Sequence, residues 1–290
     1  MATDQGPVVQ SMLLRGELVR LRKESGLTQE QVAGSLEWSP SKLIRVEGGR
    51  SSITKVDLDA LLTAYGVTSE SRRDQLQSLN RGARERAWWD AYKDDVSPDY
   101  LNYVGLEAGA AYIRQFQLGF IPGLLQTEDY AMAVTRVGSV EPARVDLLVG
   151  LRMRRQAELA RRSSPPRQYF VIDETVIRRH IGIKKDRAIM PAQLRHVASR
   201  AEQDELVTIR VIPFGTGAHP GLFGPFTLLE FEGGLSDVLY LDAGRGAFNV
   251  ISGNDLQLAA YADDFENLLE DALPADKSIE FIRSVADELS

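Results

Sequence analysis

The sequence predicts a multidomain protein, with an all-α N-terminal domain of five short helices followed by an α+β domain with a mixed sheet. Two observations predict this. Apolar residues recur at helical spacing up to residue 83. From residue 98 onward, short runs rich in β-branched and aromatic residues alternate with helical patterns, which favours helices packed on a sheet. We therefore assign residues 1–83 to a helix-turn-helix domain, 84–97 to a linker or bridging helix, and 98–290 to an α+β domain.

The composition excludes several classes of protein. An apolar share of 43% and a charged share of 26% are those of an ordinary globular protein. No apolar run reaches the roughly 18 residues that a membrane span needs, and the first residues, MATDQGPVVQS, lack the pattern of a secretory signal. The absence of cysteine removes disulfides, thiolate nucleophiles and cysteine-based zinc sites. We therefore expect a cytoplasmic protein without membrane contact.

The net charge of −7 is divided unevenly along the chain. Residues 1–83 hold 11 basic and 10 acidic residues, whereas the remainder holds 23 basic and 31 acidic residues. Between Ser39 and Lys55 there are four basic residues and one acidic residue. Because local charge meets phosphate, this short segment is the candidate contact with nucleic acid, and the acidic remainder has another role.

The first helices have clear start and stop signals. Leu14, Leu18 and Leu21 predict a helix over 11–25, ended by Gly26. Thr28 with Gln31 forms the capping-box pattern that opens a second helix, which reaches about residue 38. Further helices are expected over 54–65 and 69–82.

A third helix follows the second after a tight turn. Ser39 is a favourable N-cap, Pro40 occupies the first helical position, and Gly48-Gly49 ends the helix after Glu47. Two short helices joined in this way form a helix-turn-helix, in which the second helix enters the major groove.

The spacing along Pro40–Glu47 predicts which side chains face DNA. With Ser41 at 0°, Arg45 falls at about 40° and Lys42 at about 100°, so the three share one arc. Leu43 and Val46 turn toward the bundle. Arg45 is the best candidate for a bidentate contact with guanine. Lys42 suits either a base or a phosphate.

The α+β domain is expected to open with a helix that starts at Ser97-Pro98. Thr127 and Asp173 are expected to cap later helices. Strands are predicted at 111–120, 169–173, 206–212, 226–232, 238–242 and 247–251. Further helices are predicted at 127–137, 142–161, 191–203, 253–272 and 276–289.

Three segments leave alternatives open. The arginine-rich helix 142–161 suits a second nucleic-acid contact, a surface for an acidic partner, or a solvated face. We favour the solvated face, whose charges can pair with Asp146 and with the acidic C-terminal helices. The glycine-rich loop 213–225 suits a flexible connection between strands better than a lid over a small-molecule pocket. Trp88-Trp89 and Tyr92 suit packing of the linker on the α+β domain better than a partner surface or pocket wall.

Motifs for catalysis are absent from the sequence. His180, His196 and His219 are widely spaced and are interpreted as surface or loop residues rather than metal ligands. The loop 213–225 joins two strands and does not open a helix, so it lacks the phosphate-binding geometry of a P-loop. We expect no catalytic residues, no metal and no cofactor.

The N-terminal third resembles the XRE class of helix-turn-helix regulators, which includes phage Cro and repressor proteins. The residues that carry the resemblance are Thr28-Gln29, Ala33, Ser39, Leu43, Val46, Glu47 and Gly49-Arg50. The resemblance implies a lambda-repressor-like fold in which Gln29 and Arg50 contact the DNA backbone and Arg22 pairs with Glu47. Pro40 departs from the polar residue common at its position, so the resemblance does not carry over the base-reading contact made there.

The remainder resembles a large actinobacterial group, including WhiJ-like regulators, in which such a head precedes a domain of undefined role. The residues that carry this resemblance are Glu107, the segment IPGLLQTEDYA at 121–131, Arg152, Arg155-Gln156, Asp173-Glu174, Met190, Gln193-Leu194 and Val211-Ile212-Pro213. It implies a transcriptional regulator, often encoded beside a small partner protein, with some antitoxin-like members.

These observations favour a sequence-specific regulator that binds double-stranded operator DNA as a homodimer and responds to a small-molecule effector or a small partner protein. The alternative is an antitoxin-like protein that neutralises a small partner and autoregulates its operon. A fused enzyme is the third and least favoured hypothesis. The residues assigned to DNA binding are Gln29, Ser39, Ser41, Lys42, Arg45 and Arg50.

Overall fold

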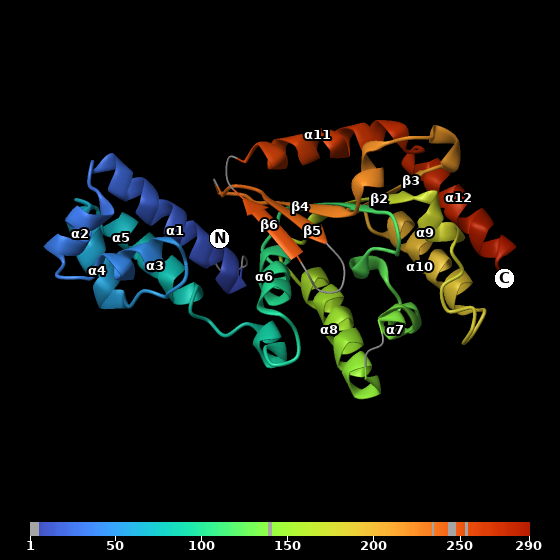
Figure 1. Cartoon of the computed structure of the whole chain (residues 1–290), viewed down its shortest axis with the longest axis horizontal. Coiled ribbons are helices and arrows are strands. Elements are labelled where there is room, and N and C mark those ends of the chain that lie inside the picture. Colours follow the sequence, from blue (N-terminus) through green and yellow to red (C-terminus); the bar gives the residue numbers. More distant parts are fainter. Residues whose placement is uncertain (1–5, 139–140, 234, 243–247, 253–254) are drawn as a thin grey trace. The chain divides into compact units, whose positions relative to one another are not determined.

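The computed structural model describes residues 6–138, 141–233, 235–242, 248–252 and 255–290 (Figure 1). The chain divides into two compact units, Met1–Ala91 and Tyr92–Ser290. The division falls within the segment 84–97 that the sequence marks as a linker.

The first unit contains the five predicted helices. They are α1 (Gly6–Glu24), α2 (Gln29–Ser35), α3 (Pro40–Glu47), α4 (Lys55–Ala64) and α5 (Glu70–Gly82). Their apolar faces meet in one core, in which Leu18, Leu43 and Leu61 are fully buried. The fold class of this unit is therefore confirmed, although α1 begins at Gly6, before the predicted start at residue 11.

Helix capping follows the sequence closely. The Thr28 hydroxyl accepts a hydrogen bond from the Gln31 amide at 3.2 Å, and the Gln31 side chain accepts one from the Thr28 amide at 2.8 Å. The predicted capping box is thus confirmed. Ser39 precedes α3 in extended conformation, but its side chain makes no capping hydrogen bond. Gly49 has φ of +71°, a left-handed backbone conformation that favours glycine, and a Cβ at this position would also have to displace the side chain of Arg15.

The segment after α5 holds a short 3-10 turn, η2 (Trp88–Tyr92), in place of a bridging helix. The rings of Trp88 and Trp89 meet edge to face, with centroids 5.4 Å apart. We expected these aromatics to pack on the α+β domain. The buried Trp89 ring lies beside Gly6 at the start of α1, within the first unit.

The second unit has the predicted α+β fold with a mixed sheet. Its strands are β1 (Tyr112–Gln117), β2 (Arg167–Asp173), β3 (Val207–Ile212), β4 (Phe226–Glu230), β5 (Val238–Asp242) and β6 (Phe248–Ser252). Its helices are α6 (Pro98–Glu107), α7 (Glu128–Val137), α8 (Pro142–Ala160), α9 (Glu174–Arg178), α10 (Ile189–Gln203), α11 (Leu256–Asp271) and α12 (Ala275–Glu288). Short 3-10 turns are η3 (Gly123–Leu125), η4 (Phe214–Thr216) and η5 (Pro220–Phe223).

The sheet has the strand order β3-β2-β1-β4-β5-β6. The strands β1, β2 and β3 run parallel, whereas β4, β5 and β6 pair antiparallel. The parallel and antiparallel halves meet at β1, which pairs with β2 on one side and β4 on the other. This position makes β1 a central strand of the unit.

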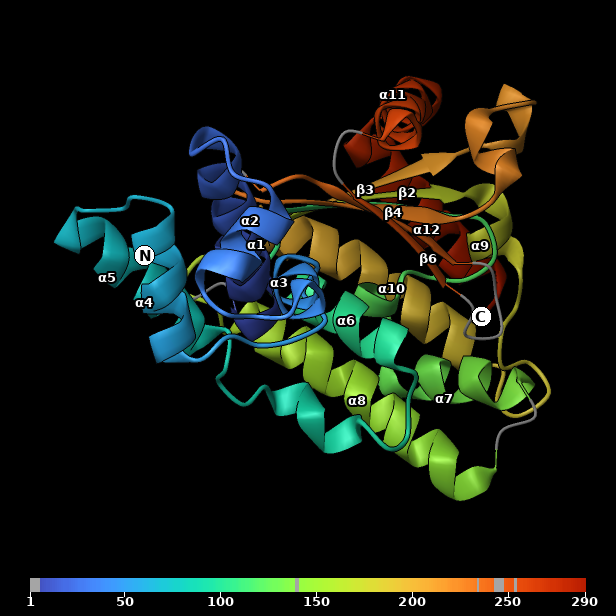
Figure 2. The same ribbon diagram turned by 60° about the vertical axis from the view of Figure 1, so that its left-hand side comes forward.

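Helices cover both faces of the sheet. In both views α11 lies on one face, and α8 and α10 lie on the other side (Figures 1 and 2). Phe116 of β1 packs with Phe226, Phe265 and Leu268 on the α11 side. Because successive strand residues point to opposite faces, Gln115 and Gln117 of β1 face the side of α6 and α8.

Candidate functional site

The exposed face of α3 is the first candidate site, and it places the side chains named for DNA contact. Ser41 and Arg45 are exposed, Lys42 is half-buried, and Leu43 and Val46 are buried in the core of the first unit. The predicted inward turn of the two apolar residues is therefore confirmed. Arg45 is a fixed positive charge on the helix surface, free to meet a phosphate or a base edge.

Lys42 is held more firmly than Arg45. Its ammonium lies 3.0 Å from Asp57 Oδ1 and 3.7 Å from the centroid of the Trp38 ring. The carboxylate of Asp57 and the ring of Trp38 therefore stabilise the Lys42 ammonium within the first unit. Lys42 is therefore oriented by its own domain, and part of its charge is already neutralised.

Ile44 was missed in the sequence analysis. Its side chain is 45% exposed on α3, three residues after Ser41 and directly before Arg45. The helical arc offered the signal, because Ile44 lies about 100° from Leu43 and outside the inward stripe. On a helix that enters the major groove, an exposed apolar side chain of this kind would suit the methyl group of thymine.

Glu47 is the buried junction of the first unit. Its carboxylate lies 2.8 Å from Arg22 Nε, accepts a hydrogen bond from Gln29 Nε2 at 2.7 Å, and accepts another from the Tyr65 hydroxyl at 3.2 Å. The ion pair with Arg22 is the one that the XRE resemblance implies. The hydrogen bond that Arg22 donates to Glu47, together with the negative charge of Glu47, raises the pKa of Arg22 despite its partial burial. The junction joins α1, α2 and α3 and fixes the angle at which α3 is presented.

The other residues named for DNA contact lie around α3. Gln29 is half-buried and is held by Glu47, whereas Ser39 and Arg50 are exposed at the two ends of α3. The backbone amide of Arg50 donates to the Arg45 carbonyl at 2.8 Å, which keeps the exposed end of the helix compact.

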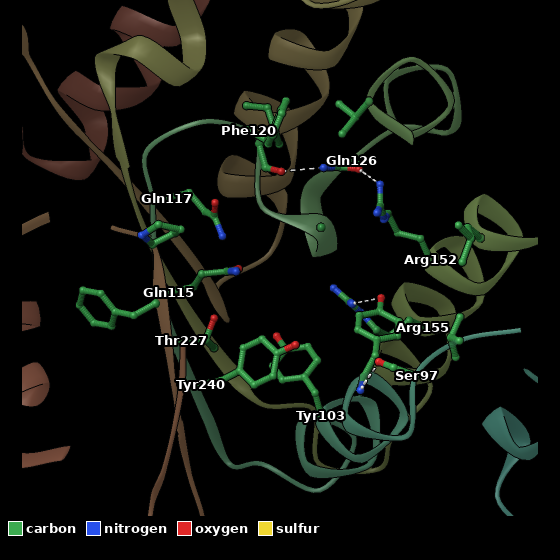
Figure 3. A pocket seen from close by; sticks show the side chains of 18 of the residues that line it. Ser97, Tyr103, Gln115, Gln117, Phe120, Gln126, Arg152, Arg155, Thr227 and Tyr240 are labelled. Atoms are coloured by element: carbon green, nitrogen blue, oxygen red, sulfur yellow. Dashed lines mark hydrogen bonds between the residues drawn. The ribbon is translucent and has the colours of Figure 1, made fainter. Parts of the chain in front are cut away.

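The second candidate site is a cleft of about 580 Å³ within the second unit (Figure 3). Its walls come from α6, β1, the turn after β1, α8, and the strands β4 and β5. Its size and its mixture of polar and apolar walls suit a small organic molecule. The sequence did not reveal this cleft.

The sheet side of the cleft is a row of polar side chains. Gln115 of β1 is paired with Thr227 of β4, and Thr227 is paired with Tyr240 of β5, so the three share one face of the sheet. Gln117 extends the row along β1, and Figure 3 shows both glutamine side chains pointing into the cleft. A polar residue at alternate positions of a buried strand was the available sequence signal.

Aromatic rings line one end of the cleft. The rings of Tyr103 and Tyr240 lie 4.2 Å apart between centroids (Figure 3). The ring of Tyr100 stacks 6.3 Å from that of Tyr103. The Tyr103 hydroxyl donates to Glu107 Oε2 at 2.9 Å. Burial, followed by the nearby Glu107 charge, raises the pKa of Tyr103, so it stays a neutral donor.

A buried ion pair supports the helix side of the cleft. Arg155 Nε lies 2.9 Å from Glu107 Oε1, and their side chains are 8% and 1% exposed. Arg155 also donates to the Tyr100 hydroxyl at 2.9 Å. Burial lowers the pKa of Arg155, but the Glu107 carboxylate and the neighbouring tyrosines raise it by more. Arg155 therefore remains charged, and Glu107 compensates that charge.

A second arginine of α8 enters the cleft with a different partner. Arg152 Nη1 donates to the side-chain oxygen of Gln126 at 2.7 Å (Figure 3). The Gln126 amide in turn donates to the Ile121 carbonyl at 2.7 Å. The guanidinium of Arg152 is thus oriented by a neutral group.

Three glutamines and a tyrosine hold the turn between β1 and α7. Gln156 donates to the carbonyls of Gly123 and Gln126, and Gln193 donates to that of Leu125. The Tyr130 hydroxyl accepts from the Ile121 amide at 3.1 Å. Many residues that carry the actinobacterial resemblance therefore belong to one network, which shapes the cleft wall.

The favoured interpretation of the basic helix was wrong for its two central arginines. Arg155 is buried and Arg152 is half-buried, although the helix was expected to present a solvated basic face. Arg155 pairs with Glu107 of α6, rather than with an acid of the C-terminal helices. Arg154, on the outer side, pairs with Glu158 of its own helix. In α11, Glu266 pairs with Arg114 of β1.

The loop 213–225 is tied to the sheet by His219. This residue was expected at the surface, but it is buried, with Nε2 3.3 Å from Asp173 Oδ2. Gly221 lies so close to the Phe116 ring that a Cβ would come within 2.2 Å of it. Of this loop, only Pro225 is among the residues that line the cleft.

Comparisons with known proteins give two family matches. A model described as "Helix-turn-helix domain" matches residues 13–76. A model described as "Domain of unknown function (DUF5753)" matches residues 100–284, more than half of the chain. No curated protein and no solved structure matches the chain. In the part of the chain that the structure describes, no helix is both long and apolar enough to cross a membrane.

Proposed function

The chain belongs to the family of the domain of unknown function DUF5753, and on this premise we propose that it is an operator-specific transcriptional regulator whose second unit responds to a small molecule. The helix-turn-helix match supports a DNA-binding regulator. The specificity, the ligand response and the XRE-like mode of docking are our proposal.

The observation that carries the DNA-binding part is the arrangement of α3. Arg45, Ser41 and Ile44 are exposed on one short helix, whose position is fixed through Glu47. In this proposal Arg45 reads a base, Ile44 contacts a thymine methyl group, and Gln29, Ser39 and Arg50 contact the phosphate backbone. Since a single head of this size makes few contacts, the protein binds a two-fold related operator as a homodimer.

The observation that supports the ligand response is the cleft of about 580 Å³ in the second unit. Its polar wall on β1 and β4 and its arginines on α8 converge on one space (Figure 3). Clefts of this size and character bind small molecules in proteins. Occupancy of the cleft would then set the affinity of the first unit for its operator through a change in the assembly.

A selection from random DNA, followed by a binding assay at fixed salt, tests the DNA-binding part. We expect Arg45→Ala to lower the affinity for the selected operator by at least about fivefold and to leave the affinity for nonspecific DNA largely unchanged. Arg81→Ala, which removes an exposed arginine from α5, is the matched control and should change operator affinity by less than about twofold. An unchanged sequence preference in Arg45→Ala would contradict the role of Arg45 in base reading.

The ligand response is tested with the small molecules released from natively purified protein. We expect this fraction to change operator affinity of the full chain, and to lose its effect when the cleft is blocked by Thr227→Trp. Operator affinity that is the same with and without the fraction would contradict the ligand response, provided that the fraction contains a compound that rebinds the protein.

A second candidate function is supported by an exposed apolar surface. Phe214, Leu222 and Phe223 on the loop 213–225 are 58%, 53% and 93% exposed. Such a surface suits a protein partner, as in the antitoxin-like alternative, in which the second unit neutralises a small protein encoded nearby. Co-expression with the product of the adjacent small gene tests it. A stoichiometric complex that Phe223→Ser disrupts supports this function, and separate elution of the two proteins contradicts it.

A further inference from the structure

We infer that the cleft of the second unit binds a small organic acid, with its anionic group on Arg152 and its flat body between the tyrosines and the polar face of β1. This inference rests on the proposed ligand response and names the chemical class of the ligand. It depends on three features of the cleft: the unbalanced charge of Arg152, the free amides of β1, and the aromatic end wall.

Three arginines of α8 line the cleft: Arg144 is exposed and donates to the Asp95 carbonyl at 3.0 Å, whereas Arg152 and Arg155 are withdrawn from solvent and differ in how their charges are balanced. Arg155 has the buried carboxylate of Glu107 at 2.9 Å. For Arg152, no carboxylate of a described residue lies within 4.0 Å, and its guanidinium donates a hydrogen bond to the neutral amide of Gln126. A guanidinium has five N–H donors, so Arg152 keeps donors that Gln126 does not use.

The surroundings of Arg152 disfavour an unpaired cation. Burial, together with the neighbouring positive charge of Arg155, lowers the pKa of Arg152. A partly buried charge is stabilised by an opposite charge that also accepts its hydrogen bonds. A carboxylate or phosphate group meets both needs, and the planar fork of arginine fits either group in a bidentate manner.

The opposite wall supplies neutral hydrogen-bonding groups. Gln115 and Gln117 point into the cleft (Figure 3), and their side-chain amides make no hydrogen bond to any residue that the structure describes. Both side chains are half-buried, and polar groups that a ligand removes from solvent need a hydrogen-bond partner on that ligand. These amides can donate to and accept from hydroxyl, carbonyl or amine groups on the body of the ligand.

The shape of the cleft favours a flat, partly apolar body. The rings of Tyr103 and Tyr240 form one wall, and Phe120, Val134 and Leu148 add apolar surface. Aromatic walls bind flat ligands by offset or edge-to-face packing. An aryl acid of about 10 to 20 heavy atoms fits a volume of this order.

Ligand-observed NMR and calorimetry on the full chain test the inference. The probes are a set of fragment-sized aryl carboxylates, each paired with its own primary amide, together with phenyl phosphate and inorganic phosphate. We expect carboxylates to bind at least about tenfold more tightly than their amides, because the amide lacks the charge that pairs with the guanidinium. Phenyl phosphate distinguishes a phosphate ligand from a carboxylate ligand.

Variants then locate the charge. Arg152→Gln should lose at least about tenfold in affinity for the best acid, and Arg152→Lys should lose less, because it keeps the charge without the planar fork. Arg154→Gln is the matched control, one arginine on the outer side of the same helix, and should change affinity by less than about twofold. Thermal unfolding of each variant shows that the second unit is folded.

Several outcomes would overturn the inference: amides that bind as well as acids, unchanged affinity in Arg152→Gln, or a set of acids in which no member binds. The result is separable from the proposed function. Acids that bind through Arg152 without changing operator affinity would uphold the ligand class and contradict the ligand response. An extract that changes operator affinity without any acid binding would do the reverse.

Discussion

Two basic helices of this protein use arginine in opposite ways. In α3, Arg45 is exposed, whereas the acid Glu47 two residues later is buried. In α8, Arg155 and Arg152 point inward, and the outer side carries Arg154. The difference follows from spacing, because Arg152 continues the buried stripe of Val145 and Val149, whereas Arg45 lies off the stripe of Leu43 and Val46. The comparison teaches that the apolar stripe, and not the number of charges, decides which arginine meets solvent.

The largest expected effect comes from removing the acid beneath α8. Glu107→Ala leaves the buried Arg155 without its carboxylate, and we expect a loss of about 3–5 kcal/mol in the stability of the second unit. Urea unfolding followed by far-UV circular dichroism and hydrogen exchange measures it. Trp38, Trp88 and Trp89 all belong to Met1–Ala91, so the tryptophan fluorescence transition should not move.

The exposed acid Glu128 provides the control for this experiment. Glu128→Ala, at the first turn of α7, should change stability by less than about 1 kcal/mol. A Glu107→Ala protein as stable as the control would mean that Arg155 is sufficiently solvated without its carboxylate. The contrast between the buried arginine of α8 and the exposed arginine of α3 would then be lost.

The corresponding change in the first unit should be smaller. Glu47→Ala removes partners of Arg22, Gln29 and Tyr65, but the side chain of Arg22 is 14% exposed, compared with 8% for Arg155. We expect a loss of about 2–3 kcal/mol, since water can reach the remaining cation. The tryptophan fluorescence transition reports it directly. A larger loss than that of Glu107→Ala would reverse the ranking of the two ion pairs.

A smaller effect distinguishes the two cations of α3. Arg45→Ala is expected to reduce operator affinity by about 1–3 kcal/mol, because it removes the exposed guanidinium that we propose reads a base. Lys42→Ala should cost less than about 1 kcal/mol, because Asp57 and Trp38 already hold that ammonium. Titrations at one salt concentration with the same operator compare them. Equal losses would show that the Asp57 contact opens on DNA.

The smallest expected effect concerns the two helix starts. Thr28→Ala removes a capping hydrogen bond that the structure shows, and should cost about 1 kcal/mol of first-unit stability. Ser39→Ala removes a side chain without such a bond, and should cost less than about 0.5 kcal/mol. Thermal unfolding followed by tryptophan fluorescence resolves the two. A similar loss for both would mean that Ser39 caps α3 in solution.

The elements of the fold could be predicted because their signals are local. Thr28, Thr54, Ser97 and Thr127 each cap the helix that the sequence assigns to them, and the strand runs fall close to the observed strands. The packing of the linker was harder to predict, because nothing in the local sequence around Trp88-Trp89 indicates which unit the two rings pack on. The direction of Arg155 was missed since its partner Glu107 is distant in sequence and belongs to another helix.

The cleft could be predicted only in fragments. Gln115 and Gln117 alternate on β1, which marks a polar face, but their neighbours Thr227 and Tyr240 are set by strand order and register. Register between distant strands depends on the packing of the whole sheet. Similarly, the buried position of His219 depends on the contact with Asp173, which only the folded chain brings together.

The position of β1 has one more consequence. Gln115 faces the cleft, and its neighbour Arg114 lies 2.7 Å from Glu230 and 2.6 Å from Glu266 on the opposite face. Since successive side chains of a strand point to opposite faces, a single layer of backbone separates the cleft from the ion pairs of Arg114. A displacement of the β1 backbone at the cleft would therefore also move the residue that pairs with α11.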